Sequence, residues 1–273
     1  MDRGFFKVLK LKSYCWKQEI VLATKNLFYL FPPKLYLPAW IVKTISEIIF
    51  FTFLGYAAAG QEGATFAFIG NSVAIVGRSI IGRGTGLIAN EKWMGTLTYI
   101  VVAPFNYFRF VVGRNVINLL EGFLASVIVF FTVGSILDIF NGNLLIYIWF
   151  MPVVLIIALS LIGLSTIIAG ITFYARTSMY VSSSIWLLLM IFCGITYPLT
   201  ILPELMQKIA YFLPTTNGIL AIRELTYKGT LNTTFFCYLI NELLIGLLYL
   251  LIGFFVMKVL IRISLKKGTL DSF

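Results

Sequence analysis

The feature that most constrains this chain is a series of apolar stretches long enough to cross a lipid bilayer. Of its 273 residues, 60% are hydrophobic and 12% are charged, whereas a soluble domain is roughly 45–50% apolar and about 25% charged. A helix needs about 20 predominantly apolar residues to cross the hydrocarbon layer. The sequence therefore predicts an all-α polytopic membrane protein with six transmembrane helices, at residues 35–59, 64–82, 106–137, 144–174, 179–200 and 236–261.

The basic residues indicate how these helices are oriented. Lys and Arg precede the first span, surround the loop between the second and third spans, and follow the last span. Cytoplasmic loops of membrane proteins carry such an excess of positive charge. We therefore expect both termini to be cytoplasmic, which leaves only Lys208, Arg223 and Lys228 on the outer side. The net charge of +10 follows this topology, so we expect no nucleic acid as a partner.

Several kinds of chemistry find no suitable residues in the sequence. The chain has no histidine, the side chain that most often acts as a general base or metal ligand. Its cysteines, Cys15, Cys193 and Cys237, are too far apart for a CxxC metal motif. No GxxxxGKS/T phosphate loop is present, and we interpret the GRGTG stretch at 82–86 as a flexible exit from the second span. We expect neither a metal nor a bound cofactor, and an enzyme is the least favoured class of function.

The segment before the first span has the pattern of an amphipathic helix at residues 13–31. Its apolar side chains recur at helical spacing: Trp16, Ile20, Ala23, Leu27 and Leu30. Lys17 and Lys25 lie between them, and the Pro32-Pro33 pair ends the pattern. A basic helix with one apolar side is typical of the inner membrane interface. The alternative is a solvated linker.

A second short amphipathic helix is predicted at residues 90–103, within NEKWMGTLTYIVVAP. Asn90 can cap its start, and Glu91 suits its first turn because a carboxylate there meets the positive end of the helix dipole. Its apolar side chains share one face: Trp93, Leu97, Ile100 and Val101. Pro104 predicts the end of the helix. The alternative is a loop helix that rests on the membrane surface.

The segment after the fifth span contains many helix breakers: Gly194, Pro198, Pro203, Pro214 and Gly218. Pro203 suits the start of a short helix at 204–212, and Asn217 could cap another that ends near Gly229. Two such pieces, too short to span, predict a re-entrant helical hairpin at 201–229 on the outer side. Such a hairpin is tolerated at membrane depth only where protein or water covers its backbone. The alternative is an ordinary external loop.

A few charged residues lie inside the predicted spans, where an exposed charge is costly. Lys43 and Glu47 are one helical turn apart and can pair, although Lys43 could instead extend toward the interface. Glu47 lies deeper and is a candidate for lining a translocation path. Glu121, beside Asn115 and Asn118, and Glu242 are expected to hold helices together by hydrogen bonds. Aromatic residues of the first span could form a lipophilic wall beside the path: Phe50, Phe51, Phe53 and Tyr56.

Taken in this order, these segments resemble the ABC-2 type permeases, the membrane subunits of bacterial ABC exporters. Their pattern of a Glu, a short gap, Gly-Thr-Leu, an apolar stretch and a Pro is matched by Glu91, Gly95–Leu97 and Pro104. Members often carry another Glu directly after Gly-Thr-Leu, where this chain has Thr98. The outer block from Gly194 to Gly229 also matches. The resemblance covers essentially the whole chain as one domain, 1–273, and is greatest to exporters of drugs, antibiotics and peptides.

The resemblance implies a mechanism and a set of site residues. Residues 90–103 would be a coupling helix seated in a groove of a separate ATPase subunit, present in two copies that bind ATP and Mg²⁺. Residues 13–31 would be a connector helix. Two permease copies, identical or paralogous, would form the path in a bacterial cytoplasmic membrane. The coupling residues would be Glu91, Trp93, Met94, Gly95, Thr96, Leu97 and Ile100; those of the path Glu47, Phe50, Phe51, Phe53, Tyr56 and Tyr197; and those of the hairpin Pro198, Pro203 and Pro214.

The function that follows is ATP-driven export of a hydrophobic or amphipathic substrate, such as a drug, an antibiotic, a peptide or a lipid-like molecule. The alternative is an ATP-independent carrier or channel driven by an ion gradient, in which the intramembrane carboxylates would be the transport site.

Overall fold

The computed structural model describes residues 33–93, 95, 107–140, 142–174 and 178–267. Every regular element in this part of the chain is helical: α3 (Pro33–Gly84), α4 (Gly86–Trp93), α6 (Tyr107–Ile136), α7 (Leu144–Tyr174), α8 (Ser178–Phe192), the 3₁₀ turn η2 (Leu199–Ile201), α9 (Glu204–Ala210), α10 (Thr216–Lys228) and α11 (Thr233–Lys267). Among the described residues, four candidate spans are long and apolar enough to cross a membrane: Pro38–Ile88, Tyr107–Ile136, Leu144–Thr172 and Thr233–Ile263. The predicted all-α fold is confirmed, while the count of six crossings stays a prediction.

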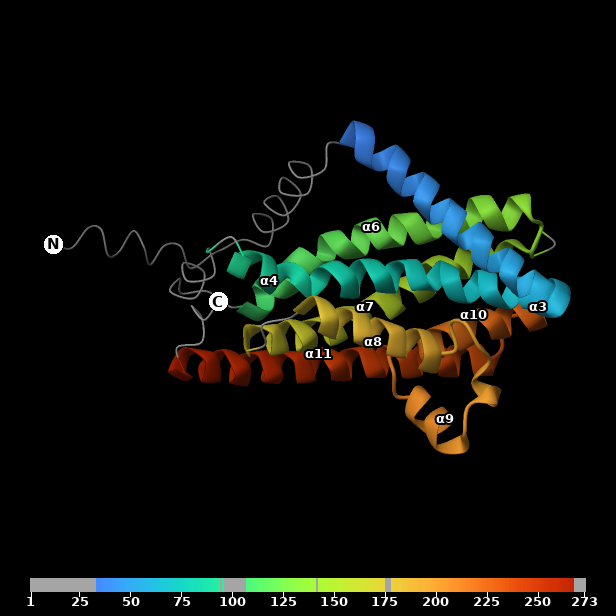
Figure 1. Cartoon of the computed structure of the whole chain (residues 1–273). Coiled ribbons are helices and arrows are strands. Elements are labelled where there is room, and N and C mark those ends of the chain that lie inside the picture. Colours follow the sequence, from blue (N-terminus) through green and yellow to red (C-terminus); the bar gives the residue numbers. More distant parts are fainter. Residues whose placement is uncertain (1–32, 94, 96–106, 141, 175–177, 268–273) are drawn as a thin grey trace.

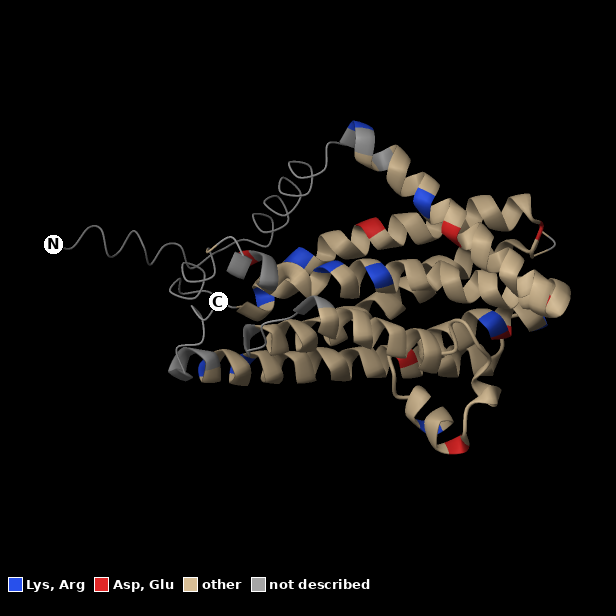
Figure 2. Cartoon of the chain, viewed as in Figure 1, with Lys and Arg blue, Asp and Glu red and all other residues tan. Residues whose placement is uncertain are grey.

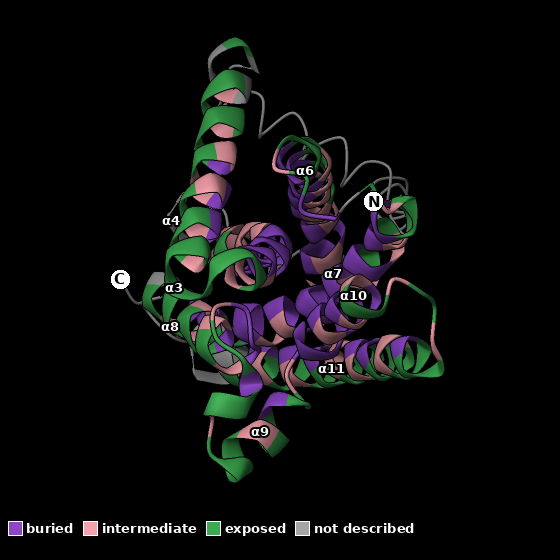
Figure 3. Ribbon diagram, turned by 90° about the vertical axis from the view of Figure 1, so that its right-hand side faces the viewer, coloured by how far each residue is buried: buried purple, intermediate pink, exposed green. Residues whose placement is uncertain are grey.

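The helices form an elongated bundle around α7 (Figure 1). α7 has no charged residue, packs against α3, α6, α10 and α11, and is largely buried (Figure 3). One end of the bundle holds α4, the last turn of α3, the start of α6 and the end of α11; we call it the α4 end. The opposite end holds α9, α10 and the start of α11, and we call it the hairpin end. Basic residues gather at the α4 end (Figure 2).

α3 consists of two helical arms, because the chain reverses direction at Ala59 (φ −147°, ψ 26°) and Gly60 (φ 63°, ψ −147°). Gly60 adopts a backbone conformation that costs glycine little. Across the reversal the arms touch: a Cβ on Gly55 would lie 2.4 Å from the Gly63 carbonyl oxygen, and one on Gly63 2.2 Å from the Gly55 carbonyl oxygen. The reversal coincides with the predicted boundary between the first two spans. Away from the reversal, toward Pro33, the first arm diverges from the bundle (Figure 1).

α8 is shorter than the sequence predicts. The predicted end of this helix at residue 200 is wrong, because the helix ends at Phe192 and Gly194 follows with φ 70°. The last helical hydrogen bond runs from the Cys193 N–H to the Leu189 carbonyl, 2.9 Å. A left-handed glycine so close to the helix end is a common helix terminator. The 15 residues of α8 rise only about 22 Å, less than the roughly 30 Å of a hydrocarbon layer.

The two short helices predicted for residues 201–229 are confirmed. α9 directly follows Pro203, and α10 ends at Gly229, whose φ is 66°. The predicted cap is wrong: Thr215 (φ 84°) precedes α10, while Asn217 lies in its first turn and donates from Nδ2 to the Tyr211 carbonyl, 2.9 Å. α10 is a core element and therefore not an ordinary external loop, whereas α9 projects away from the bundle (Figure 1). That this hairpin re-enters the membrane stays a prediction.

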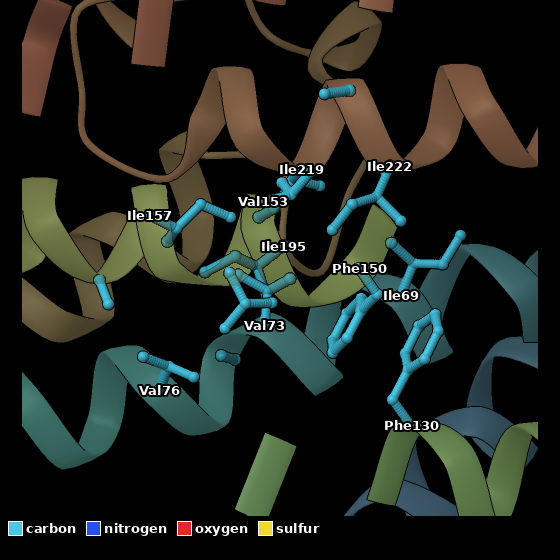
Figure 4. Close-up of a cluster of buried hydrophobic side chains, with 14 of the residues drawn as sticks. Ile69, Val73, Val76, Phe130, Phe150, Val153, Ile157, Ile195, Ile219 and Ile222 are labelled. Carbon is cyan, nitrogen blue, oxygen red and sulfur yellow. The ribbon is translucent and has the colours of Figure 1, made fainter. Parts of the chain in front are cut away.

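The core lies between the second arm of α3, α6, α7 and α10 (Figure 4). Phe130 of α6 stacks on Phe150 of α7 with ring centroids 3.6 Å apart, and Phe68 of α3 stacks on Phe130 at 5.3 Å. Ile195, from the turn after α8, extends into the same core beside side chains of α3 and α10 (Figure 4). Burial of these large side chains is the dominant contribution to packing.

Candidate functional site

The first part of the site is the α4 end, where the sequence predicts a partner-binding helix. α4 directly continues α3, because Thr85 bonds to the Ile81 carbonyl through its N–H (3.4 Å) and its Oγ1 (2.7 Å). Gly84 packs so closely on α6 that a Cβ would lie 2.0 Å from Asn115 Oδ1. The GRGTG stretch is therefore a close helix contact with a single turn residue, so its interpretation as a flexible exit is wrong.

The predicted start of the short helix at Asn90 is also wrong. α4 begins at Gly86, which places Asn90 and Glu91 within the helix, and Gly95 follows with φ 67°. No cap is needed at Asn90, since α4 follows directly on α3. The coupling residues Met94, Thr96, Leu97 and Ile100 lie outside the described residues, as does the predicted connector helix at 13–31. Their coupling role, like that of Trp93, stays a prediction.

Glu91 is held inside the protein. Its carboxylate pairs with Arg114 of α6 at 2.5 Å, and the residue is 7% exposed. The Arg114 guanidinium also lies 4.4 Å from the centre of the Phe110 ring, a cation–π contact. A buried pair of this kind tolerates loss of either partner poorly. Glu91 thus joins α4 to α6, a role that the sequence pattern does not reveal.

Apolar packing reinforces this joint. Ile88 of α4 lies in a small buried cluster with Phe110 and Val111 of α6, Ala169 of α7, and Met257 and Ile261 of α11. α4 therefore rests on the ends of three long helices. A displacement of α4 would be transmitted to all three, because close-packed interiors transmit strain.

A second charged cluster links both arms of α3 to α6. Arg83 donates from Nη2 to Glu121 Oε1 at 2.7 Å and to the Tyr36 hydroxyl at 2.5 Å, and its Nη1 pairs with Oε2. The Tyr36 hydroxyl donates to Glu121 Oε1 at 2.5 Å. Nearby, Asn118 donates to Asn115 and Asn115 to Ser165 of α7, each at 3.3 Å. The expectation that Glu121 holds helices together is confirmed.

Glu47 has a different partner from the one expected. Its carboxylate pairs with Arg78 on the second arm of α3, and Lys43 is exposed. Of the two possibilities left open for Lys43, the pair with Glu47 is not the one formed, because the reversal of α3 brings Arg78 opposite Glu47. The Glu47–Arg78 pair is partly exposed. The position of Glu47 beside a translocation path stays a prediction.

The aromatic residues assigned to the path lie mostly on a free surface. Phe50, Phe53 and Tyr56 are exposed on the first arm of α3, while Phe51 is half-buried with its ring edge-on to Phe50 at 5.4 Å. Tyr197 is exposed in the turn between α8 and η2. Their role in a path stays a prediction, since lipid or another subunit could cover the same surface.

The second part of the site is the hairpin end, where Glu242 of α11 anchors α10. Glu242 is fully buried and accepts from Ser160 Oγ of α7 at 2.6 Å, the Thr215 N–H at 2.8 Å and the Gly218 N–H at 3.2 Å. It therefore occupies the positive end of the α10 dipole. Gly218 permits close packing of α10 on α7, since a Cβ there would lie 2.3 Å from Ile157. The expectation of a structural role is confirmed.

Arg223 is the residue that the sequence analysis missed. It lies on α10, is 6% exposed, and places its guanidinium 3.4 Å from the centre of the Phe66 ring of α3. Its Nη2 donates to the Phe66 carbonyl at 3.3 Å and to the Ile195 carbonyl at 3.5 Å. The available signal was its position four residues after Ile219 and one after Ile222, on the buried side of a helix.

The other charges of α10 lie at its periphery. Glu224 pairs with Lys228 one turn later and accepts from Thr234 Oγ1 at 2.9 Å. The hydrogen bond from Lys228, with a further contribution from Thr234, lowers the pKa of Glu224. No group of His, Cys, Asp and Glu side chains suited to a metal ion occurs among the residues that the structure describes.

The geometry can be compared with known families. The profile of the family described as ABC-2 type transporter matches residues 14–227, which include α4, α6 and most of α10. The comparison with curated proteins found no match. Because the family match covers well over half of the chain, the protein belongs to the ABC-2 type transporter family and is a multi-pass membrane permease without an ATP-binding site of its own.

Proposed function

We propose that this chain is the membrane subunit of an ATP-driven exporter that moves a hydrophobic or amphipathic substrate out of the cell. Two copies of an ATPase, which bind ATP and Mg²⁺, would contact residues 90–103 on the cytoplasmic side. Two permease copies, identical or paralogous, would form the path in a bacterial cytoplasmic membrane, with both termini of each chain inside.

The observation that carries this proposal is the joint between α4 and the bundle. Glu91 and Arg114 join α4 to α6, and Ile88 seats it on α7 and α11. A helix that receives force must transmit it, and a buried ion pair over a close-packed cluster suits that task better than a mobile loop. Glu91 would thus act behind the ATPase contact, within the permease.

The first arm of α3 supports a path shared between two copies. It diverges from the bundle (Figure 1) and exposes apolar side chains along its length, among them Phe50, Phe53 and Leu54. A path between two such faces would suit an apolar or amphipathic substrate. The hairpin, with Pro198, Pro203 and Pro214, would close its outer end.

The experiment purifies the chain from its native membrane, identifies the co-purifying ATPase, and measures ATP-dependent efflux of a lipophilic dye from reconstituted vesicles. E91Q and R114M should keep the ATPase bound but lower the transport per ATP hydrolysed by about tenfold or more, a typical size for allosteric coupling. E204Q, at an exposed carboxylate of α9, is the matched control. Unchanged coupling in both variants would contradict the role of the joint.

An ion-coupled carrier is the alternative, and the same vesicles test it. The intramembrane carboxylates Glu47, Glu121 and Glu242 each contact a partner in the described part of the chain, which leaves them poorly suited to exchange ions. If dye efflux ran on an ion gradient without the ATPase, the exporter proposal would fail.

A further inference from the structure

Arg223 lies at a junction of three elements at the hairpin end. α10 carries the residue, the second arm of α3 supplies the Phe66 ring and carbonyl, and the turn after α8 supplies the Ile195 carbonyl. Glycines line the junction: a Cβ on Gly70 would lie 2.1 Å from the Ile195 oxygen and 3.1 Å from Arg223 Nη2. A Cβ on Gly194 would lie 3.5 Å from Nη1. The guanidinium therefore lies between the Phe66 ring and the backbone of Phe66, Gly70, Gly194 and Ile195.

No carboxylate in the described part of the chain forms an ion pair with Arg223. The carboxylates in ion pairs there, Glu47, Glu91, Glu121 and Glu224, each pair with a different cation. The Glu242 carboxylate accepts hydrogen bonds from the Ser160 hydroxyl and from N–H groups at the start of α10. The buried Nε atom of Arg223 has no hydrogen-bond acceptor among the described residues. The guanidinium is thus a buried cation in contact with neutral groups.

This environment does not satisfy the guanidinium. Hydrogen bonds of ionised donors are normally about 2.7–2.9 Å long, whereas its two carbonyl contacts are 3.3 and 3.5 Å. The Phe66 ring offers a cation–π contact but no acceptor for Nε. Burying a charge without a counter-charge is unfavourable, and such residues in membrane proteins usually mark ion or substrate pathways.

We propose that Arg223 binds the anionic group of an amphipathic substrate, a carboxylate, phosphate or sulfate, at the outer part of the path. The planar guanidinium can donate to two oxygens of such a group. The anion would replace the long contact between Arg223 and the Ile195 carbonyl and so free the turn at 193–195 from α10. This assignment rests on the proposed transport function, since it takes the anion to be cargo.

A native thiol reports whether that turn is freed. Cys193 is 1% exposed and contacts the Pro214 carbonyl, 3.3 Å from Sγ. With Cys15 and Cys237 changed to serine, Cys193 is the only thiol left in the chain. The experiment measures its rate of maleimide labelling in the full chain, held in phosphatidylcholine nanodiscs without any ATPase. Decyl phosphate, decyl maltoside and decyltrimethylammonium, at equal concentrations, serve as anionic, neutral and cationic probes.

Decyl phosphate should raise the labelling rate at least about fivefold, the lower range of typical allosteric coupling, and the other two probes should not. R223M should abolish the response, R223K should weaken it, and K208M, at an exposed cation of α9, should respond like the starting protein. R223Q replaces R223M if the latter does not fold. An equal response to all three probes, or a full response in R223M and R223Q, would overturn the proposal.

One further arm separates the sources of the anion, and the absence of an ATPase separates this proposal from the proposed function. Phosphatidylglycerol in the nanodiscs tests a lipid headgroup: an Arg223-dependent response to it alone would show anion binding with lipid as the source. A response to neither lipid nor decyl phosphate would refute anion binding. Because the assay contains no ATPase, its failure would leave the coupling experiment standing, and failure of the coupling experiment would leave the anion site intact.

Discussion

The two ends of the bundle differ in whether their buried charged side chains have a counter-charge. At the α4 end, Arg114 and Arg83 each meet a carboxylate, Glu91 and Glu121. At the hairpin end, Glu242 and Arg223 are both buried, and each contacts only neutral groups among the described residues. Paired charges cross-link helices, which would suit the force-receiving role proposed for the α4 end. A buried charge without a counter-charge suits an end that must open or bind, provided that one anchor remains.

Glu242 is that anchor, and its loss should have the largest effect on stability. E242A would leave the Thr215 and Gly218 N–H groups buried without their acceptor, whereas the Ser160 hydroxyl would keep the Ile157 carbonyl at 2.8 Å. Each such group costs about 1–3 kcal/mol, so we expect the free energy of unfolding in detergent to fall by about 3–5 kcal/mol. Denaturant titration followed by helical circular dichroism measures it. E204Q is the control, and equal stability of the two variants would refute the anchoring role.

The pair at the α4 end should show the next largest effect. E91Q leaves the Arg114 guanidinium buried without its counter-charge, so we expect a loss of about 2–3 kcal/mol, somewhat below the value for fully buried pairs. R114M should cost a similar amount. The double variant E91M/R114M should recover much of the loss, because it leaves no unpaired charge behind. A double-mutant cycle on unfolding free energies measures the coupling, and strictly additive losses would contradict a direct pair.

Arg223 should behave in the opposite sense to Arg114, which is the sharpest test of the comparison. R223M replaces a buried cation without a carboxylate by an apolar side chain of similar length. We expect the free energy of unfolding to stay unchanged or to rise by about 1 kcal/mol, as found when buried charges are replaced by apolar groups. Thermal unfolding of R223M and R114M, compared side by side, measures the contrast. A loss in R223M as large as in R114M would break the distinction between the two ends.

The smallest expected effect lies at the periphery of the hairpin end. Since the pKa of Glu224 is lowered from its ordinary value of 4.5, the carboxylate contributes stability above that value and loses it as pH falls through the lowered pKa. Near pH 7, E224Q should be less stable than the parent by about 0.3–0.5 kcal/mol, as for exposed i,i+4 pairs. Near pH 3 the difference should vanish. Thermal unfolding at both pH values measures it, and a difference that grows in acid would contradict this sign.

The sequence predicted well those features that depend on neighbouring residues. Apolar stretches place α6, α7 and α11, and the breakers Pro203 and Gly229 bound the two hairpin helices. Predictions at helix ends were weaker. Asn90 and Asn217 have the chemistry of helix caps, but the direct continuation of α3 into α4 and the left-handed Thr215 placed the true starts elsewhere.

By itself, the sequence determined that the chain is a helical membrane protein, because hydrophobic length and breaker residues act locally along the chain, and its motifs carried the resemblance to the ABC-2 type permeases that the family match confirms. Only the tertiary structure decided which charges meet. Glu47 pairs with Arg78 rather than Lys43, Glu91 faces α6, and Arg223 has no carboxylate partner among the described residues. Side chains from different helices are brought together by packing, and at membrane depth a charge must take whatever partner the packing supplies.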